Sequence, residues 1–295
     1  MVGDSETRTE HAIRRNGGSR PISRRSARYL ISIRLVQIIV LLVLVFPILF
    51  AVLTALEPTA ASLSGKVTFD FTPTLDNFSA VLSQGGLDRP LLNSALSSGL
   101  SALIAMIVGL PAAYALARVE LRAYWLVRAA LFAARGLPAI GVVIPFFIIF
   151  TDIHLIDTIW ALAIVYLPFN VALVVWLMAQ YFAAIPVDLD EAAALDGCGH
   201  LSTLWRIALP LSRPGLVSTA MMTFVYGWNN FIYPLLLTNR NAVTASVSIT
   251  SFVGEYVINW GEIMAGAVVL SAPMLVLGYG LRRYMVSGLT QGSIR

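Results

Sequence analysis

Long stretches without a charged residue recur along the chain and constrain its fold more than any other feature. Each is long enough to cross a bilayer, which takes about 20 residues of helix. A soluble all-α core is the alternative, but its helices need charged faces, and only 12% of the residues are charged, against about 25% in soluble domains. The sequence predicts an all-α membrane protein with six transmembrane helices at 35–56, 91–117, 127–150, 158–181, 215–237 and 263–281.

The distribution of lysine and arginine indicates how these helices are oriented. The region before the first span holds eight arginines, and most of the others lie in the even-numbered connections and at the C-terminus. The opposite side has only Lys66, Arg89 and Arg240. Because basic residues concentrate on the cytoplasmic side of a membrane, we expect both termini and the 182–214 loop in the cytoplasm.

The same segments define the domain organisation. We predict a basic, disordered cytoplasmic tail over 1–34, a six-helix membrane domain over 35–287 and a cytoplasmic C-terminal tail over 288–295. The N-terminal tail has only Tyr29 as an aromatic residue, so its charge indicates contact with anionic lipid headgroups and not nucleic-acid binding. One cysteine and three scattered histidines predict no metal site.

The 186–214 loop, between the fourth and fifth spans, has the pattern of two short helices. Asp188 and Glu191 are spaced as a capping box, which predicts a helix start, and Gly197 predicts a left-handed cap at its end. A second helix is predicted with one apolar face, formed by Leu201, Leu204, Trp205, Ala208 and Leu209. We expect this second helix to lie along the base of the bundle and to hold the first one out as a docking element for a soluble partner.

Two carboxylates of the first short helix, Glu191 and Asp196, are suited to pairing with an arginine or lysine of a docked protein. An alternative of equal weight on the residues alone is that these acids only cap and solvate the loop. The residues by themselves leave both interpretations open.

Polar side chains inside the spans indicate where a solute could pass, because such groups are costly unless they face a cavity or one another. Amide groups and aromatic faces complement the hydroxyls and C–H faces of sugars. The alternative is that these residues only form hydrogen bonds between helices. The candidates are Asn93, Ser97, Ser98, Asn170, Trp228, Asn229, Asn230 and Tyr233.

The second and third spans carry further signals. Pro138 and Pro145 predict that the third span is kinked or locally unwound. Arg135 is the one charge inside a span; we expect it to snorkel, to pair with an acid of a partner subunit or to lie nearer the cytoplasmic edge, and we favour a structural role. In the second span, Gly109 and the small residues after it predict close approach of a neighbouring helix.

The loop between the fourth and fifth spans resembles the EAA loop of ABC importer permeases, with the family's spacing throughout. The matching residues are Glu191, Ala192, Ala193, Gly197, Ile207, Leu209 and Pro210. Three further segments, Ala112–Arg118, Trp228-Asn229 and Gly288–Gly292, are similar to the smaller permease subunit of maltose-type transporters. Cys198 stands where the family usually has Ala. Asn230 stands where an acidic residue is common, and this second difference bears on substrate choice.

The resemblance implies a binding-protein-dependent ABC importer permease fold, in the bacterial inner membrane, with 188–197 as a coupling helix seated in a separate ATPase. The residues it carries over to ATPase coupling are Glu191, Ala192, Ala193, Asp196, Gly197, Leu209 and Pro210. The implied partners are a second related permease, two ATPase subunits that hold ATP and Mg, and an external binding protein that delivers a sugar or related polyol. This chain itself is expected to bind no cofactor. The 238–262 loop would face the binding protein, and 288–295 the ATPase.

The chain is not expected to be an enzyme. Its only Gly-Lys pair, Gly65-Lys66, lacks the preceding glycine and the following Ser or Thr of a phosphate-binding loop, and no catalytic constellation is recognisable. The alternative function is an ion-coupled secondary solute transporter, which would need acidic residues inside the spans. A membrane-anchored assembly protein is a third interpretation, but it leaves the polar residues of the spans unexplained.

Overall fold

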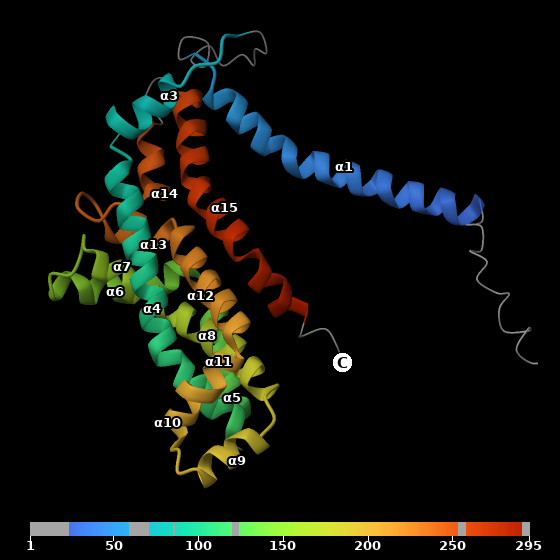
Figure 1. The fold of residues 1–295 in the computed structure, drawn as a ribbon. Coiled ribbons are helices and arrows are strands. Elements are labelled where there is room, and N and C mark those ends of the chain that lie inside the picture. The colour runs from blue at the N-terminus through green and yellow to red at the C-terminus, as the bar shows by residue number, and fades with distance from the viewer. Residues whose placement is uncertain (1–23, 59–70, 85, 120–123, 253–257, 291–295) are drawn as a thin grey trace, which may run out of the picture. The chain divides into compact units, whose positions relative to one another are not determined.

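The computed structural model describes residues 24–58, 71–84, 86–119, 124–252 and 258–290 (Figure 1). The chain divides into two compact units, Met1–Phe50 and Ala51–Arg295. The described part of the first unit is helix α1, which runs from Arg24 to Ala55 and so ends in the second unit. From Leu35 onward α1 is apolar on every side, as is typical of a membrane span. The helix begins inside the predicted tail, whose residues 1–23 lie outside the described ranges.

The second unit is a bundle of long helices joined by short ones. In chain order its elements are α3 (Asp76–Ser79), η1 (Ala80–Gln84), α4 (Asp88–Arg118), α5 (Tyr124–Gly136), α6 (Ala139–Asp152), α7 (Ile159–Val165), α8 (Leu167–Ala183), α9 (Asp188–Leu195), α10 (His200–Thr203), η2 (Leu204–Ala208), α11 (Leu209–Leu211), α12 (Arg213–Trp228), α13 (Ile232–Leu237), α14 (Ala245–Ser248), η3 (Ile249–Phe252) and α15 (Trp260–Thr290). Elements η1 and η2 are π-helical, and η3 is a 3₁₀-helix. α15 continues into the predicted C-terminal tail.

Helices able to cross a membrane account for up to five of the six predicted spans in the described part of the chain. α1, α4 and α15 each contain a continuous apolar segment of sufficient length. The other two are bent pairs: α5 and α6 meet at 89°, and α7 and α8 at 45°. The remaining predicted span, 215–237, corresponds to α12, which has only 16 residues, followed by α13. The predicted all-helical class is confirmed.

The break between α5 and α6 has the cause that the sequence predicts. Pro138 stands immediately before α6 in an extended conformation, with φ −65° and ψ 135°, and it has no N–H with which to continue α5. Pro145, in contrast, lies inside α6 without interrupting it. The first proline alone therefore produces the bend.

Helices α4, α8 and α12 pack against one another and form the largest part of the core. The predicted close approach at Gly109 is confirmed, because a Cβ atom added there would lie 2.7 Å from Cγ1 of Val174 on α8. Two glycines of α12 are equally tight: a Cβ at Gly215 would meet the Tyr181 ring at 2.5 Å, and one at Gly227 would meet Ser98 Oγ at 2.9 Å. Small residues thus set the spacing of the three central helices.

Adding a methyl group at Gly109 is expected to destabilise the bundle. The Gly109→Ala variant forces α4 away from the rigid, β-branched Val174, and overpacking of this kind costs about 1–3 kcal/mol. Thermal unfolding of the purified protein should show a lower midpoint. Gly278→Ala in α15 is the matched control, because its added Cβ makes only an ordinary 3.7 Å contact with Met221. Equal midpoints for the two variants would contradict the close approach.

Two groups of connecting segments lie toward opposite ends of the second unit. Figure 1 shows α9 and α10 at one end, close to the end of α4, and α3 and α14 toward the other. The 186–214 loop therefore lies opposite the described parts of the two long loops before α4 and before α15. Such a separation is required if successive loops lie on alternate sides of a membrane.

Candidate functional site: the docking loop and the central pocket

Helix α9 is present where the sequence predicts a short helix, but its start differs. Val187 is the residue that precedes the helix, and its carbonyl accepts the N–H of Glu191 at 3.1 Å. Asp188 is already the first helical residue, and no side chain caps this end. The predicted capping box is therefore wrong. The prediction fails because Val187 has helical φ and ψ. The helix therefore begins one residue earlier than predicted, and Asp188 lies inside it and not at the capping position.

The end of α9 is as predicted. Gly197 has φ +80°, a left-handed conformation that glycine adopts without strain. The N–H of Cys198 donates to the Ala193 carbonyl at 2.9 Å, and the N–H of Gly197 donates to the Ala194 carbonyl at 3.0 Å. This pair of bonds is a Schellman motif, which satisfies two carbonyls at the helix end and turns the chain sharply into α10.

The second helix of the loop does not present the single apolar face that was predicted. Leu204, Ala208 and Leu209 are buried, but Leu201 and Trp205 are exposed. The reason is the π-helical turn η2, in which Leu209 N–H bonds to the Leu204 carbonyl five residues back. Each π turn holds more residues than an α turn, so residues spaced for one α-helical face no longer share it.

The exposed side chains of this loop form what we term the docking surface. It consists of Glu191, Leu195, Asp196, Leu201 and Trp205. Leu195 is 90% exposed, which is unusual for a large apolar side chain and typical of a surface that another molecule covers. Of the other residues carried over by resemblance, Ala192, Gly197 and Pro210 are exposed, whereas Ala193 and Leu209 are buried and hold the loop onto the bundle.

An ion pair fixes α9 to the end of α4, and sequence reasoning missed it. Arg118, the last residue of α4, pairs with Asp190, and their side chains are only 12% and 17% exposed. The Tyr114 hydroxyl donates to Asp190 Oδ1 at 2.8 Å, and the Tyr114 ring also lies 5.9 Å from the Arg118 guanidinium. We refer to Tyr114, Arg118 and Asp190 as the clamp. It connects the docking surface rigidly to a helix that runs the length of the second unit.

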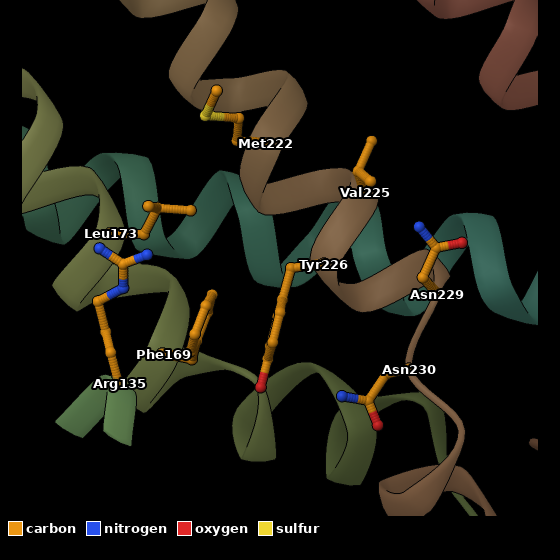
Figure 2. A pocket seen from close by; sticks show the side chains of 8 residues that line it. All are labelled: Arg135, Phe169, Leu173, Met222, Val225, Tyr226, Asn229 and Asn230. Atoms are coloured by element: carbon orange, nitrogen blue, oxygen red, sulfur yellow. The ribbon is translucent and has the colours of Figure 1, made fainter. Parts of the chain in front are cut away.

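A pocket of about 450 Å³ lies between α5, α8 and α12. Figure 2 shows Arg135 at one end of it and Asn229 and Asn230 at the other, with Phe169 and Tyr226 between them. The two aromatic rings are stacked, with centroids 3.7 Å apart. The volume is in the usual range for small-molecule sites, about 300–1,000 Å³. The pocket therefore brings together a cation, aromatic rings and amides.

Of the residues predicted to line a solute pathway, the pocket brings together Asn229 and Asn230. Three others are used elsewhere: the Asn93 amide donates to the carbonyls of Asn241 and Val243, Asn170 donates to Ser101, and Trp228 donates to the Leu270 carbonyl. Tyr233 is buried against Tyr166. Ser97 donates to the Asn93 carbonyl, and Ser98 is buried beside Gly227. Hydrogen bonds between helices thus account for Asn170 and Trp228, and hydrogen bonds to a loop account for Asn93. The pathway itself stays a prediction.

Asp157, in the connection between α6 and α7, holds a loop on the other side of the second unit. Its carboxylate accepts the backbone N–H groups of four consecutive residues, 239–242, at 2.9–3.1 Å. Burial by itself would raise its pKa, but these four hydrogen bonds outweigh burial and lower the pKa to about 2. Within the described ranges no group of three His, Cys, Asp or Glu residues could hold a metal ion.

Replacing this carboxylate is expected to loosen the loop at neutral pH. Because the pKa of Asp157 is lowered in the folded protein, its stabilising contribution is complete above the ordinary value of 3.8 and is lost as the pH falls toward about 2. Asp157→Asn should therefore unfold at a lower temperature than the parent, by the same margin from about pH 5 to 8. Asp152→Asn, an exposed residue at the end of α6, is the control. A difference in unfolding temperature that changes between about pH 5 and 8 would contradict the lowered pKa of Asp157.

Comparisons with known proteins agree on the family. The family described as binding-protein-dependent transport system inner membrane component matches residues 105–291. A probable ABC transporter permease protein of Sinorhizobium fredii, y4oR, is 33% identical over 86% of this chain and 91% of its own length. The trehalose/maltose transport system permease protein MalG of Thermococcus litoralis is 32% identical over 88% of this chain and 94% of its own.

A solved structure shares the fold. It is a chain of a bacterial ABC transporter involved in the import of alginate, with a TM-score of 0.72 and 20% identity, and the likeness covers 89% of this chain and 98% of that one. The region matched by the family, residues 105–291, contains the whole 186–214 loop and the residues that line the pocket. The chain therefore belongs to the family of inner membrane components of binding-protein-dependent transport systems.

Proposed function

We propose that this chain is the permease subunit of an ATP-driven importer that takes up a carbohydrate or related polyol. The observation that carries the proposal is the docking surface: a rigid loop with exposed acids and large apolar side chains, tied by the clamp to a helix that passes the pocket. The coupling residues predicted from the EAA resemblance lie in this loop. A transporter that contained its own energy source would not need such a surface.

In this proposal α9 sits in a cleft of a separate ATPase subunit, and Glu191 makes its charged contact. When two ATPase subunits close on ATP and Mg, they draw α9 toward its counterpart on a second, related permease. The clamp passes that movement to α4, and α4 carries it to α8 and α12, which pack against it. The two ends of the bundle are thereby coupled through one two-state element.

The proposal includes six spans, with α12 and α13 together forming the fifth, and both termini in the cytoplasm. The docking loop and the loop held by Asp157 lie toward opposite ends of the second unit, which is consistent with this topology (Figure 1). Large apolar side chains exposed on α4, α6 and α15, such as Leu103, Ile148 and Val276, would contact lipid or the second permease.

The solute class rests on the relatives. Two permeases 32–33% identical to this chain are named for the transport of trehalose or of trehalose and maltose. A second solved structure is of a bacterial alginate ABC transporter in complex with a periplasmic protein that holds an alginate pentasaccharide. The matching chain of that complex has a fold similar to this chain, with a TM-score of 0.63. We infer that an external binding protein delivers a carbohydrate to the end of the bundle that carries the 238–252 loop.

Purification of the complex through an affinity tag on this chain tests the proposal. We expect an ATPase and a second permease to co-purify, and we expect hydrolysis to rise when the binding protein and its carbohydrate are added. Recovery of the chain alone from gently solubilised membranes that contain both candidate partners would contradict it.

A further inference from the structure

Arg135 lies in the last turn of α5, at the point where the third span bends, and its side chain lines the pocket. In the described part of the chain, no carboxylate pairs with it; the ion pair seen there joins Arg118 to Asp190 in the clamp. None of the described residues accepts a hydrogen bond from its guanidinium, which has five N–H donors. A charge without a counter-charge inside a predicted span is expensive and marks a functional position.

The contacts that Arg135 does make hold its position without neutralising it. Its guanidinium lies 5.5 Å from the centre of the Phe169 ring and 4.9 Å from that of Trp176, so two aromatic faces of α8 orient it. The carbonyl end of α5 offsets part of the charge. Both interactions leave its N–H donors free to bind an acceptor that enters the pocket.

The rest of the pocket is neutral and suited to a sugar ring. Beyond the stacked Phe169 and Tyr226 rings lie the amides of Asn229 and Asn230. Because Asn230 Oδ1 already accepts the Tyr233 N–H at 3.2 Å, Asn230 offers its N–H donors, and Asn229 offers both donors and an acceptor. Amides discriminate between hydroxyl patterns but do not distinguish a neutral solute from an anion. Arg135 is the group in this pocket that makes that distinction, because a guanidinium binds carboxylate, sulfonate and phosphate with paired hydrogen bonds.

We propose that the solute of this importer carries a negative charge, and that Arg135 binds that charge while Asn229 and Asn230 bind its hydroxyl groups. The proposal rests on the proposed function and narrows it from carbohydrates in general to acidic carbohydrates. The competing occupant of Arg135 is a carboxylate of the second permease, in which case the solute would be neutral.

The test is uptake by the whole purified complex with its binding protein, reconstituted in vesicles of phosphatidylcholine alone and of phosphatidylcholine with an anionic phospholipid. The probes are matched sets of labelled sugars: a neutral sugar, its uronate, its sulfonate and its phosphate. The variants are Arg135→Gln, Arg135→Lys and, as a control on an exposed arginine outside the pocket, Arg89→Gln. Co-purification of the second permease is measured for each variant.

We expect the charged member of a set to be taken up in preference to its neutral counterpart, whatever the lipid. Arg135→Gln should lower that uptake roughly 10- to 100-fold, as loss of a charge-assisted hydrogen bond implies. Arg135→Lys should retain part of it, and Arg89→Gln all of it.

Preferential uptake of the neutral sugar would overturn the proposal, as would unchanged uptake of the acidic one by Arg135→Gln. Loss of the second permease from Arg135→Gln would assign the residue to the subunit contact, and an effect confined to anionic vesicles would assign it to a lipid headgroup. Both results would also overturn it. Failure of the importer function itself is distinguishable, because no sugar of either charge would then be taken up with ATP.

Discussion

Glu191→Ala is expected to lower carbohydrate-stimulated ATP hydrolysis by at least about tenfold, because the loss of one partner from a buried interfacial charge pair costs about 2–5 kcal/mol. Glu191 is exposed in the first turn of α9, and nothing in the described chain occupies its carboxylate. The measurement is hydrolysis by the complex purified through this chain, with its binding protein and a transported sugar.

A matched control separates docking from a general loss of charge. Glu262→Ala removes a carboxylate at the start of α15, away from the docking surface, and should leave hydrolysis unchanged. The amount of co-purified ATPase should fall in Glu191→Ala alone. If Glu191→Ala couples as well as Glu262→Ala does, Glu191 is not the charged contact and serves only to solvate the loop.

The clamp leads to a different result: Asp190→Ala is expected to uncouple the transporter while the ATPase stays bound. Removal of one partner leaves Arg118 buried without its counter-charge, which costs about 3–5 kcal/mol for buried pairs. The docking surface itself keeps Glu191. We therefore expect hydrolysis to persist in the complex but carbohydrate uptake to fall by at least about tenfold, since α9 can then move without α4.

A double-mutant cycle identifies the clamp as the cause. Arg118→Ala should have the same effect as Asp190→Ala, and the double variant should be no worse than either single one, because residues that act as a pair are not additive. Tyr114→Phe removes only the 2.8 Å hydrogen bond and should have a smaller effect in the same direction. Additive losses in the double variant would show that Arg118 and Asp190 act independently.

The helical architecture could be predicted from the sequence because a bilayer leaves the chain few choices. Backbone groups must be paired inside each span, so a long uncharged run reads directly as a helix. Local backbone chemistry was equally predictable at Pro138 and Gly197, where the missing N–H and the positive φ are properties of the residue itself.

Predictions failed where they depended on an ideal helical period or on neighbours in space. Leu201 and Trp205 were placed on a buried face by assuming 3.6 residues per turn, and the π turn η2 removed them from it. The clamp could not be found, because Tyr114 and Asp190 are 76 residues apart and each has an ordinary local explanation, as a residue of the span or of the loop.

The pocket was predicted only in part for a related reason. Asn229 and Asn230 stand out because polar groups are rare inside a span. Phe169 and Tyr226 do not, since an aromatic residue in an apolar segment has the same appearance whether it packs in a core or faces a cavity. Only their place in space, beside Arg135 and the two asparagines, shows that they line the pocket.

The measurement that tests the importer function most directly is uptake of a labelled carbohydrate into proteoliposomes that contain the complete complex. ATP is enclosed, the binding protein is outside, and ionophores abolish ion gradients. We expect accumulation that requires both ATP and the binding protein and that the ionophores do not reduce. Accumulation without ATP that follows a proton or sodium gradient would contradict this function and would instead establish an ion-coupled secondary transporter.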